Sequence, residues 1–151
     1  MSAVQLCPAR PLDAGTVGAI IGAHVDATDW LPRVHSRAEE VMFAADMIDA
    51  GWVTTARTDA GVVGFLALDG TEIQGLYVAP EAQNRAAGTA LLTHAKRRCN
   101  RLGLWSYARN TSANRFYERA GFRPVERSNG ADNDAGLPDI RYEWHASREA
   151  P

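Results

Sequence analysis

The stretch TEIQGLYVAPEAQNRAAGTALLTHAK, residues 71–96, decides the fold because a strand pattern passes into a helix pattern within it. Apolar side chains alternate with others before Pro80, and beyond the polar QNR segment apolar or small residues recur every four positions. Three small residues, Ala86, Ala87 and Gly88, occupy the first turn of the predicted helix. Their lack of bulk suggests that something comes close to the backbone there.

The segment that follows predicts how this stretch is placed in a sheet. We expect the helix to begin at residue 83 or 84 and to continue to Leu102, where Gly103 ends it. A further strand is predicted at 104–108. Strand, helix and strand in this order form a right-handed crossover, so the strands at 71–79 and 104–108 should be parallel neighbours inside a mixed sheet.

The remainder of the chain completes the pattern of a single domain. Asp13 is a suitable N-cap for a helix that starts at residue 14, and Ser36 with Glu39 forms a capping box for a helix that runs to Ala50. Further strands are predicted at 3–9, 52–58, 62–68, 122–127 and 139–145, with a helix at 111–121. The order β-α-α-β-β-β-α-β-α-β-β predicts an α/β (α+β) domain over residues 1–145, with a mixed, mostly antiparallel sheet, helices on both faces and a frayed tail at 146–151.

The composition is that of an ordinary globular domain. The chain has 151 residues, 46% hydrophobic and 23% charged, and a net charge of -2, which favours neither a nucleic-acid nor a membrane partner. No segment approaches the roughly 20 apolar residues of a membrane span, and the N-terminus lacks a signal pattern. Two isolated cysteines and four scattered histidines predict a reduced, cytoplasmic chain without a metal site: Cys7, Cys99, His24, His35, His94 and His145.

The small residues at the helix start allow two interpretations. Unpaired amides at a helix N-terminus carry the positive end of the helix dipole and bind anions, so RAAGT (85–89) fits a phosphate cradle. Equally, Ala86, Ala87 and Gly88 allow the helix to pack closely on the sheet. The chain has neither GxxxxGK[ST] nor a GxGxxG after its first strand, so two familiar phosphate loops are excluded.

Two motifs occur together in this part of the chain. In EIQGLYVAPEAQNRAAGTALL (72–92), Gln83, Ala86 and Gly88 occupy the positions of a Q/R-x-x-G-x-G/A signature. ARNTSANRFYERAGF (108–122) contains N-x-x-A-x-x-F-Y-x-x-x-G-F. Together they resemble the GNAT superfamily of acetyl-CoA-dependent N-acetyltransferases, and the resemblance covers residues 52–145. Ala86 departs from the pattern, because the family usually has glycine there.

The resemblance implies a site for acetyl-CoA as co-substrate. The amide of Leu76 would lie near the thioester oxygen, beside a bulge at Gly75, and the amides of 84–89 with the Thr89 hydroxyl would hold the pyrophosphate. Asn110 would hydrogen-bond the cofactor arm, cap its own helix, or do both. The implied cofactor-binding residues are Leu76, Tyr77, Val78, Gln83, Asn84, Arg85, Ala86, Ala87, Gly88, Thr89 and Asn110.

Two catalytic residues follow from the same resemblance. Tyr117 would protonate the departing thiolate, and the alternative is a half-buried tyrosine that packs beside Phe116. A thiol and a phenol have ordinary pKa values near ~8.5 and ~10, close enough to share a proton. Glu72 matches the general base of some members and would point into the cleft with Gln74. Ordered water as the base, with Glu72 an exposed strand-edge residue, is the alternative.

Acceptor recognition is expected from the loops at 28–36 and 128–138, with Trp30 and His35 as walls of the acceptor site. The acceptor would be a primary amine, on a small molecule or a peptide N-terminus, and the resemblance is compatible with a homodimer. A non-catalytic acyl-CoA-binding or regulatory module on the same fold is the alternative function. Tyr117 favours catalysis, whereas Ala86 favours the module.

Overall fold

The computed structural model describes residues 3–80 and 85–146, and its elements follow the predicted order with one added 3-10 turn, η1. In chain order they are β1 (Gln5–Pro8), η1 (Pro11–Asp13), α1 (Ala14–Asp26), α2 (Arg37–Asp49), β2 (Val53–Thr58), β3 (Gly61–Asp69), β4 (Glu72–Val78), α3 (Arg85–Arg98), β5 (Arg101–Tyr107), α4 (Thr111–Arg119), β6 (Arg123–Ser128) and β7 (Asp139–His145). The predicted frayed tail lies outside the described residues, apart from Ala146. No helix in the described part is long and apolar enough to cross a membrane.

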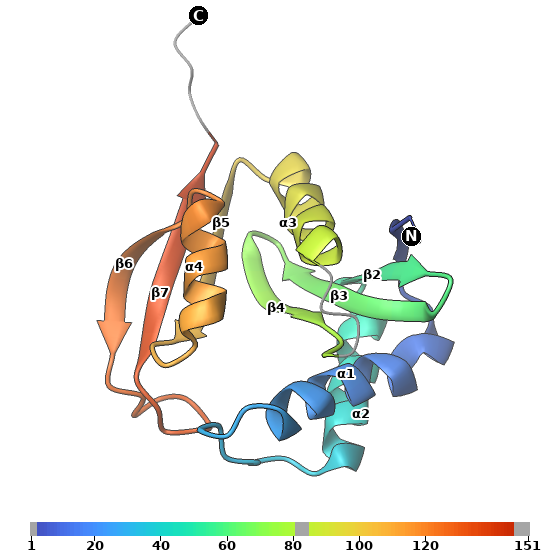
Figure 1. The fold of residues 1–151 in the computed structure, drawn as a ribbon, viewed down its shortest axis with the longest axis horizontal. Coiled ribbons are helices and arrows are strands. Elements are labelled where there is room, and N and C mark those ends of the chain that lie inside the picture. Colours follow the sequence, from blue (N-terminus) through green and yellow to red (C-terminus); the bar gives the residue numbers. More distant parts are fainter. Residues whose placement is uncertain (1–2, 81–84, 147–151) are drawn as a thin grey trace, which may run out of the picture.

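The seven strands form one sheet in the order β1-β2-β3-β4-β5-β7-β6 (Figure 1). Neighbouring strands are antiparallel except for β4 and β5, which are parallel. The parallel pair results from the crossover through α3, as the strand–helix–strand pattern predicted. The predicted mixed, mostly antiparallel sheet is therefore confirmed.

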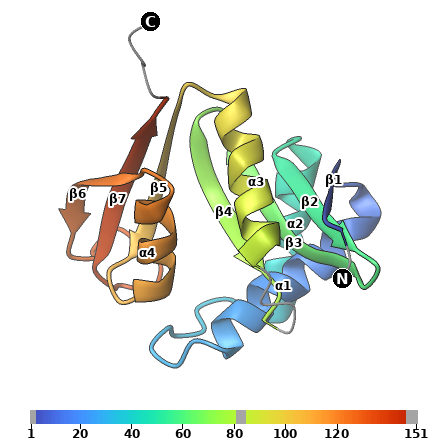
Figure 2. The ribbon, with the colours of Figure 1, turned by 45° about the horizontal axis from the view of Figure 1, so that its top comes forward.

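The sheet is interrupted between β4 and β5. Among the described residues, the ladder between these strands has one register pair, Glu72 with Gly103, and beyond it the strands diverge (Figures 1 and 2). On the other side of β4, the ladder with β3 slips between Ala67 and Leu68 and leaves Gln74 as an extra residue. This bulge lies beside Gly75, where a bulge was predicted, and it bends β4 away from a regular course.

Helices cover both faces of the sheet, as predicted. Leu66 of β3 packs in a core with α3 and α4, whereas its neighbours Phe65 and Ala67 pack in a second core with α1 and α2. Alternate side chains of one strand thus serve opposite layers. The helical residues of these cores are Ala87, Leu91, Leu92, Ala95 and Tyr117 on one face, and Val17, Ile20, Ala44 and Ile48 on the other.

The end of α3 differs from the prediction. The helix ends at Arg98, and both Leu102 and Gly103 belong to β5. Leu102 pairs with Trp144 of β7 and is 2% exposed. Its apolar side chain packs in the core that α3 and α4 share with the sheet. The predicted helix end was wrong because one apolar residue three positions after Cys99 fits a helical stripe as well as a strand.

Asp13 does not cap α1, contrary to the prediction. Its backbone is helical (φ -81°, ψ -8°), and its carboxylate accepts hydrogen bonds from Arg57 Nη2 at 2.7 Å and the Arg10 amide at 2.8 Å. Burial alone would raise the pKa of Asp13, but the Arg10 amide and the Arg57 guanidinium outweigh it and lower this pKa. The buried ion pair ties the start of α1 to β2 across the sheet.

We expect Asp13→Asn to reduce the free energy of unfolding by about 1–3 kcal/mol at pH 7, because a charge-assisted hydrogen bond to Arg57 is lost. The Asp13 pKa is lower in the folded chain, so the stabilisation is present above the unfolded value of 3.8 and is lost as the pH falls through the lower folded value. Urea unfolding at pH 7 and near pH 3 measures both effects. Asp46→Asn, at an exposed position on α2, is the control and should change stability by less than about 0.5 kcal/mol. Equal unfolding free energies for wild type and Asp13→Asn at pH 7 would contradict the assignment.

Candidate active site

A cavity of about 980 Å³ occupies the gap between β4 and β5. The β4 residues from Ile73 to Val78 line its middle. Gly88 and Phe116 line it from the α3 and α4 side, and His24 and Leu31 line it from the α1 side. Because residues of both helical layers line one cavity, two molecules can approach β4 from opposite faces of the sheet and meet there.

The small residues at the start of α3 have different surroundings. Ala87 is fully buried in the core against the sheet, as close packing requires. Gly88 lines the cavity, and a Cβ at this position would lie 3.6 Å from Phe116 and 3.8 Å from Val78, which are ordinary van der Waals distances. Packing within the protein therefore does not require a glycine at residue 88. The absent side chain instead leaves room in the cavity.

Ala86 lies inside α3 and is exposed. An alanine adopts the helical backbone conformation without strain, so its presence where the family usually has glycine does not distort the helix start. Arg85 is the first residue of the helix and Thr89 lines the cavity. Gln83 and Asn84, the other predicted contacts of the phosphate groups, lie outside the described residues.

Strand β4 presents main-chain groups to the gap. Alternate residues of an antiparallel strand direct their N–H and C=O groups away from the partner strand, here β3. Among the described residues, β5 offers no ladder partner to the stretch from Leu76 to Val78. The side chains of Leu76 and Val78 pack toward α3, and that of Tyr77 packs toward α1 and α2. Main-chain groups of β4 are thus left for a ligand.

Tyr117 packs in the core and also lines the cavity. Its ring packs against Phe116 and Phe122 at centroid distances of 5.4 and 5.5 Å, and the residue is 8% exposed. Burial raises the pKa of Tyr117, and nearby Tyr77 raises it further, so the phenol stays protonated at any physiological pH. Within the described residues the hydroxyl makes no hydrogen bond, and its proton remains available.

Glu72 does not share the cavity with Gln74, contrary to the expectation. Gln74 lines the cavity, whereas Glu72 does not, and its Oε2 accepts a hydrogen bond from Arg141 Nη1 at 2.6 Å. The bulge explains the difference, because it breaks the two-residue alternation of β4. Ile73 and Leu76, three residues apart, both pack against the α3 side as a result. The Glu72 carboxylate is committed to an ion pair away from the gap.

Two asparagines hold the start of α4. Asn110 caps this helix by accepting a hydrogen bond from the Ala113 amide at 3.2 Å, as one interpretation predicted, and it also lines the cavity. Asn114 was not predicted. It is buried, accepts a 2.7 Å hydrogen bond from Ser106 Oγ and donates to the carbonyl of Tyr107. These bonds fix α4, and with it Tyr117, against β5.

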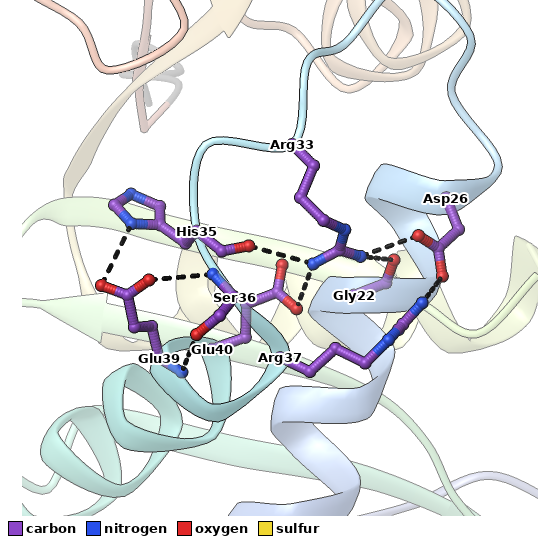
Figure 3. A network of polar contacts seen from close by, with 8 residues as sticks. All are labelled: Gly22, Asp26, Arg33, His35, Ser36, Arg37, Glu39 and Glu40. Carbon is purple, nitrogen blue, oxygen red and sulfur yellow. Dashed lines mark hydrogen bonds and ion pairs between the residues drawn. The ribbon is translucent and has the colours of Figure 1, made fainter.

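The loop between α1 and α2 is organised by Arg33, which sequence reasoning missed (Figure 3). Its guanidinium donates to Asp26 Oδ1 at 2.7 Å and to Glu40 Oε1 at 2.8 Å. It also donates to the carbonyls of Gly22 and His35, both at 3.1 Å. Glu40 is 4% exposed, and a buried carboxylate requires such a cation. These contacts, the Arg33 network, hold the loop against both helices.

The two predicted acceptor-site residues have different positions. His35 lines the cavity, and its Nε2 lies 3.0 Å from Asp134 Oδ2, which links the two loops expected to recognise the acceptor. Trp30 is not among the cavity residues. It packs edge-on against Tyr107 at 5.8 Å, with the Arg109 guanidinium over its ring. Trp30 therefore holds the loop at 28–36 against Tyr107 and Arg109.

His24 of α1 also lines the cavity and was not predicted as a site residue. Its ring centroid is 5.0 Å from that of Tyr77, and burial lowers the pKa of His24. Its position, four residues after buried Ile20, continues the inward stripe of α1, and a histidine on such a stripe is a signal that sequence reasoning could have used. The described residues contain no cluster of three or more His, Cys, Asp or Glu that could hold a metal.

Comparison with known proteins relates the chain to acetyltransferases. Residues 49–124 match the family model described as an acetyltransferase (GNAT) domain. The chain is 32% identical over 122 residues to the peptidyl-lysine N-acetyltransferase YjaB of Salmonella typhimurium (strain LT2), covering 80% of this chain and 82% of that protein. It is 33% identical over 69 residues to the peptidyl-lysine N-acetyltransferase YiaC of Escherichia coli (strain K12), covering 45% and 47%.

Solved structures share the fold. The solution structure of apo-form YjaB from Escherichia coli superposes with a TM-score of 0.79 at 23% identity, covering 96% of this chain and 99% of that one. The structure of yncA from Salmonella typhimurium with acetyl-CoA has a TM-score of 0.71 at 18% identity, covering 99% and 97%. These likenesses concern the fold, and the family model together with the YjaB sequence match goes further: the chain belongs to the GNAT family of acetyltransferases.

Proposed function

We propose that this protein transfers an acetyl group from acetyl-CoA to the side-chain amine of a lysine in a peptide or protein. The observation that carries the proposal is the cavity between β4 and β5, which is lined from both faces of the sheet. A direct transfer between two bound molecules needs such a passage. The choice of lysine is supported by the names of YjaB and YiaC, peptidyl-lysine N-acetyltransferases, and is narrower than the primary amine that the sequence implied.

The residues of the α3 and α4 side fit acetyl-CoA, which supplies the activated thioester when bound. Gly88 leaves space beside the first turn of α3, where unpaired amides attract phosphate groups. The free main-chain edge of β4 from Leu76 to Val78 suits the amide groups of the pantetheine arm. Arg115 and Arg119, one turn apart on α4, add positive charge to the cavity lining and were not predicted from the sequence.

Three sets of groups in the chain then act in the acetyl transfer. The Leu76 amide stabilises the oxygen that gains negative charge. Tyr117 donates its proton to the departing sulfur, and its raised pKa ensures that the proton is present. Asn110 and Asn114 keep the tyrosine in position through α4. The module alternative loses its main support, because Ala86 is accommodated within α3.

Acetyl-CoA should raise the melting temperature of the protein, because it binds only the native state; at 100 times Kd the stabilisation is about 2.7 kcal/mol. Gly88→Leu should lose most of this shift, because a Cβ has room at residue 88 and the rest of the larger side chain fills the cavity. The melting temperature of the variant without acetyl-CoA shows whether it folds normally. Arg97→Leu, at an exposed position of the same helix, is the matched control and should retain the shift. An undiminished shift in Gly88→Leu would refute the placement of the cofactor.

The protein should release CoA thiol and add one acetyl group to an N-terminally blocked peptide that contains a single lysine. The same peptide with arginine in place of lysine should not react, and spermidine tests a small-molecule acceptor. Tyr117→Phe should lower kcat by about 10²–10⁴-fold while the thermal shift with acetyl-CoA persists. Tyr142→Phe, a buried tyrosine that is not among the cavity residues, should keep its turnover rate. Binding of acetyl-CoA with no thiol release from either amine would favour the non-catalytic module instead.

A further inference from the structure

We propose that the imidazole of His24 takes the proton from the acceptor ammonium, on the opposite side of β4 from Tyr117. This inference rests on the proposed function and deepens it, because it names the base that the reaction requires. It replaces Glu72, whose carboxylate is bound to Arg141 and is not among the cavity residues.

The two residues lie on opposite sides of the sheet but line one cavity. Tyr117 belongs to the core shared with α3 and α4. His24 contacts Tyr77, whose ring packs in the core shared with α1 and α2. A proton acceptor on one face and a proton donor on the other is the arrangement that a direct transfer at β4 requires, because the amine and the thioester arrive from opposite sides.

His24 is free to accept a proton. Among the described residues, its ring has no hydrogen-bond or ion-pair partner, and its main-chain carbonyl accepts a side-chain hydrogen bond from Thr28 Oγ1 at 2.6 Å. Burial lowers the pKa of His24, so the imidazole is neutral at pH 7 and carries a lone pair. The position is therefore suited to a base.

The other titratable groups on this side of the cavity are committed or neutral. Glu40 of α2 is paired with Arg33, and His35 is hydrogen-bonded to Asp134. The phenols of Tyr77 on β4 and Tyr107 on β5 have pKa values raised by burial and stay protonated. Of the two imidazoles on this side, that of His24 is the one without a side-chain hydrogen-bond partner among the described residues.

The lysine ammonium gives one proton to His24, and the resulting amine nitrogen forms a bond to the thioester carbon. The carbon–sulfur bond then breaks, and the sulfur takes the Tyr117 proton. The second proton that leaves the nitrogen restores the Tyr117 hydroxyl, and His24 releases its proton to water. The products are the acetylated lysine, CoA thiol and one proton.

The test is the pH dependence of kcat with saturating acetyl-CoA and blocked lysine peptide. In the wild type, kcat should rise through the lowered pKa of His24 and become level above pH 7. In His24→Gln it should fall about 100-fold at pH 7 and rise tenfold per pH unit toward the lysine pKa near ~10.4, because only free amine then reacts. His94→Gln, on α3 and not among the cavity residues, should behave as the wild type.

Each outcome decides between the proposals. An unchanged profile in His24→Gln, or an equal loss of rate at every pH, overturns the role of His24 while the acetyltransferase function stands. No peptide acetylation by the wild type overturns the proposed function and this inference with it. The His24 ring proton, assigned by its loss in His24→Gln or His24→Asn, gives a readout without turnover. The midpoint of its NMR titration should lie below pH 6.5, and a midpoint above pH 7 would overturn the inference.

Discussion

The incomplete pairing of β4 with β5 is the constraint on which the rest of the structure depends. Once the ladder has ended at Glu72 and Gly103, main-chain donors and acceptors of β4 face the cavity without a strand partner among the described residues. Backbone groups left unpaired in this way need another partner, such as a ligand or water. The bulge at Gln74 and the crossover through α3 maintain the separation, so the fold keeps a place open beside β4.

The two faces that border this gap are built differently. On the α3 and α4 side, side chains of regular helices and the cap of Asn110 set the geometry. On the α1 side, two irregular loops depend on polar contacts, chiefly those of Arg33 and the link between His35 and Asp134. A regular helix keeps its shape when surface residues change, whereas such loops do not. The same fold can therefore keep the α3 and α4 side constant while the loops on the α1 side vary.

The sequence was informative where local patterns governed the outcome. The strand within 71–79, the capping box at Ser36 and the crossover were confirmed because each depends on neighbouring residues. Asp13 and Glu72 were misplaced because their partners, Arg57 and Arg141, are distant in the chain and a sequence pattern cannot show such pairs. The Arg33 network was missed although its partners are near in the chain, because an irregular loop has no repeating spacing that would indicate which side chains meet. His24 was overlooked because it was considered only as a possible metal ligand.

The contacts that hold the α1–α2 loop determine how this loop responds to salt. Arg33 attaches this loop to both helices through a half-buried guanidinium. The loop also contacts the loop at 128–138, where His35 meets the exposed Asp134. Exposed charges are screened by salt, while buried pairs are screened much less. The attachment of the loop to α2 through Arg33 and Glu40 should therefore persist at salt concentrations that weaken exposed ion pairs.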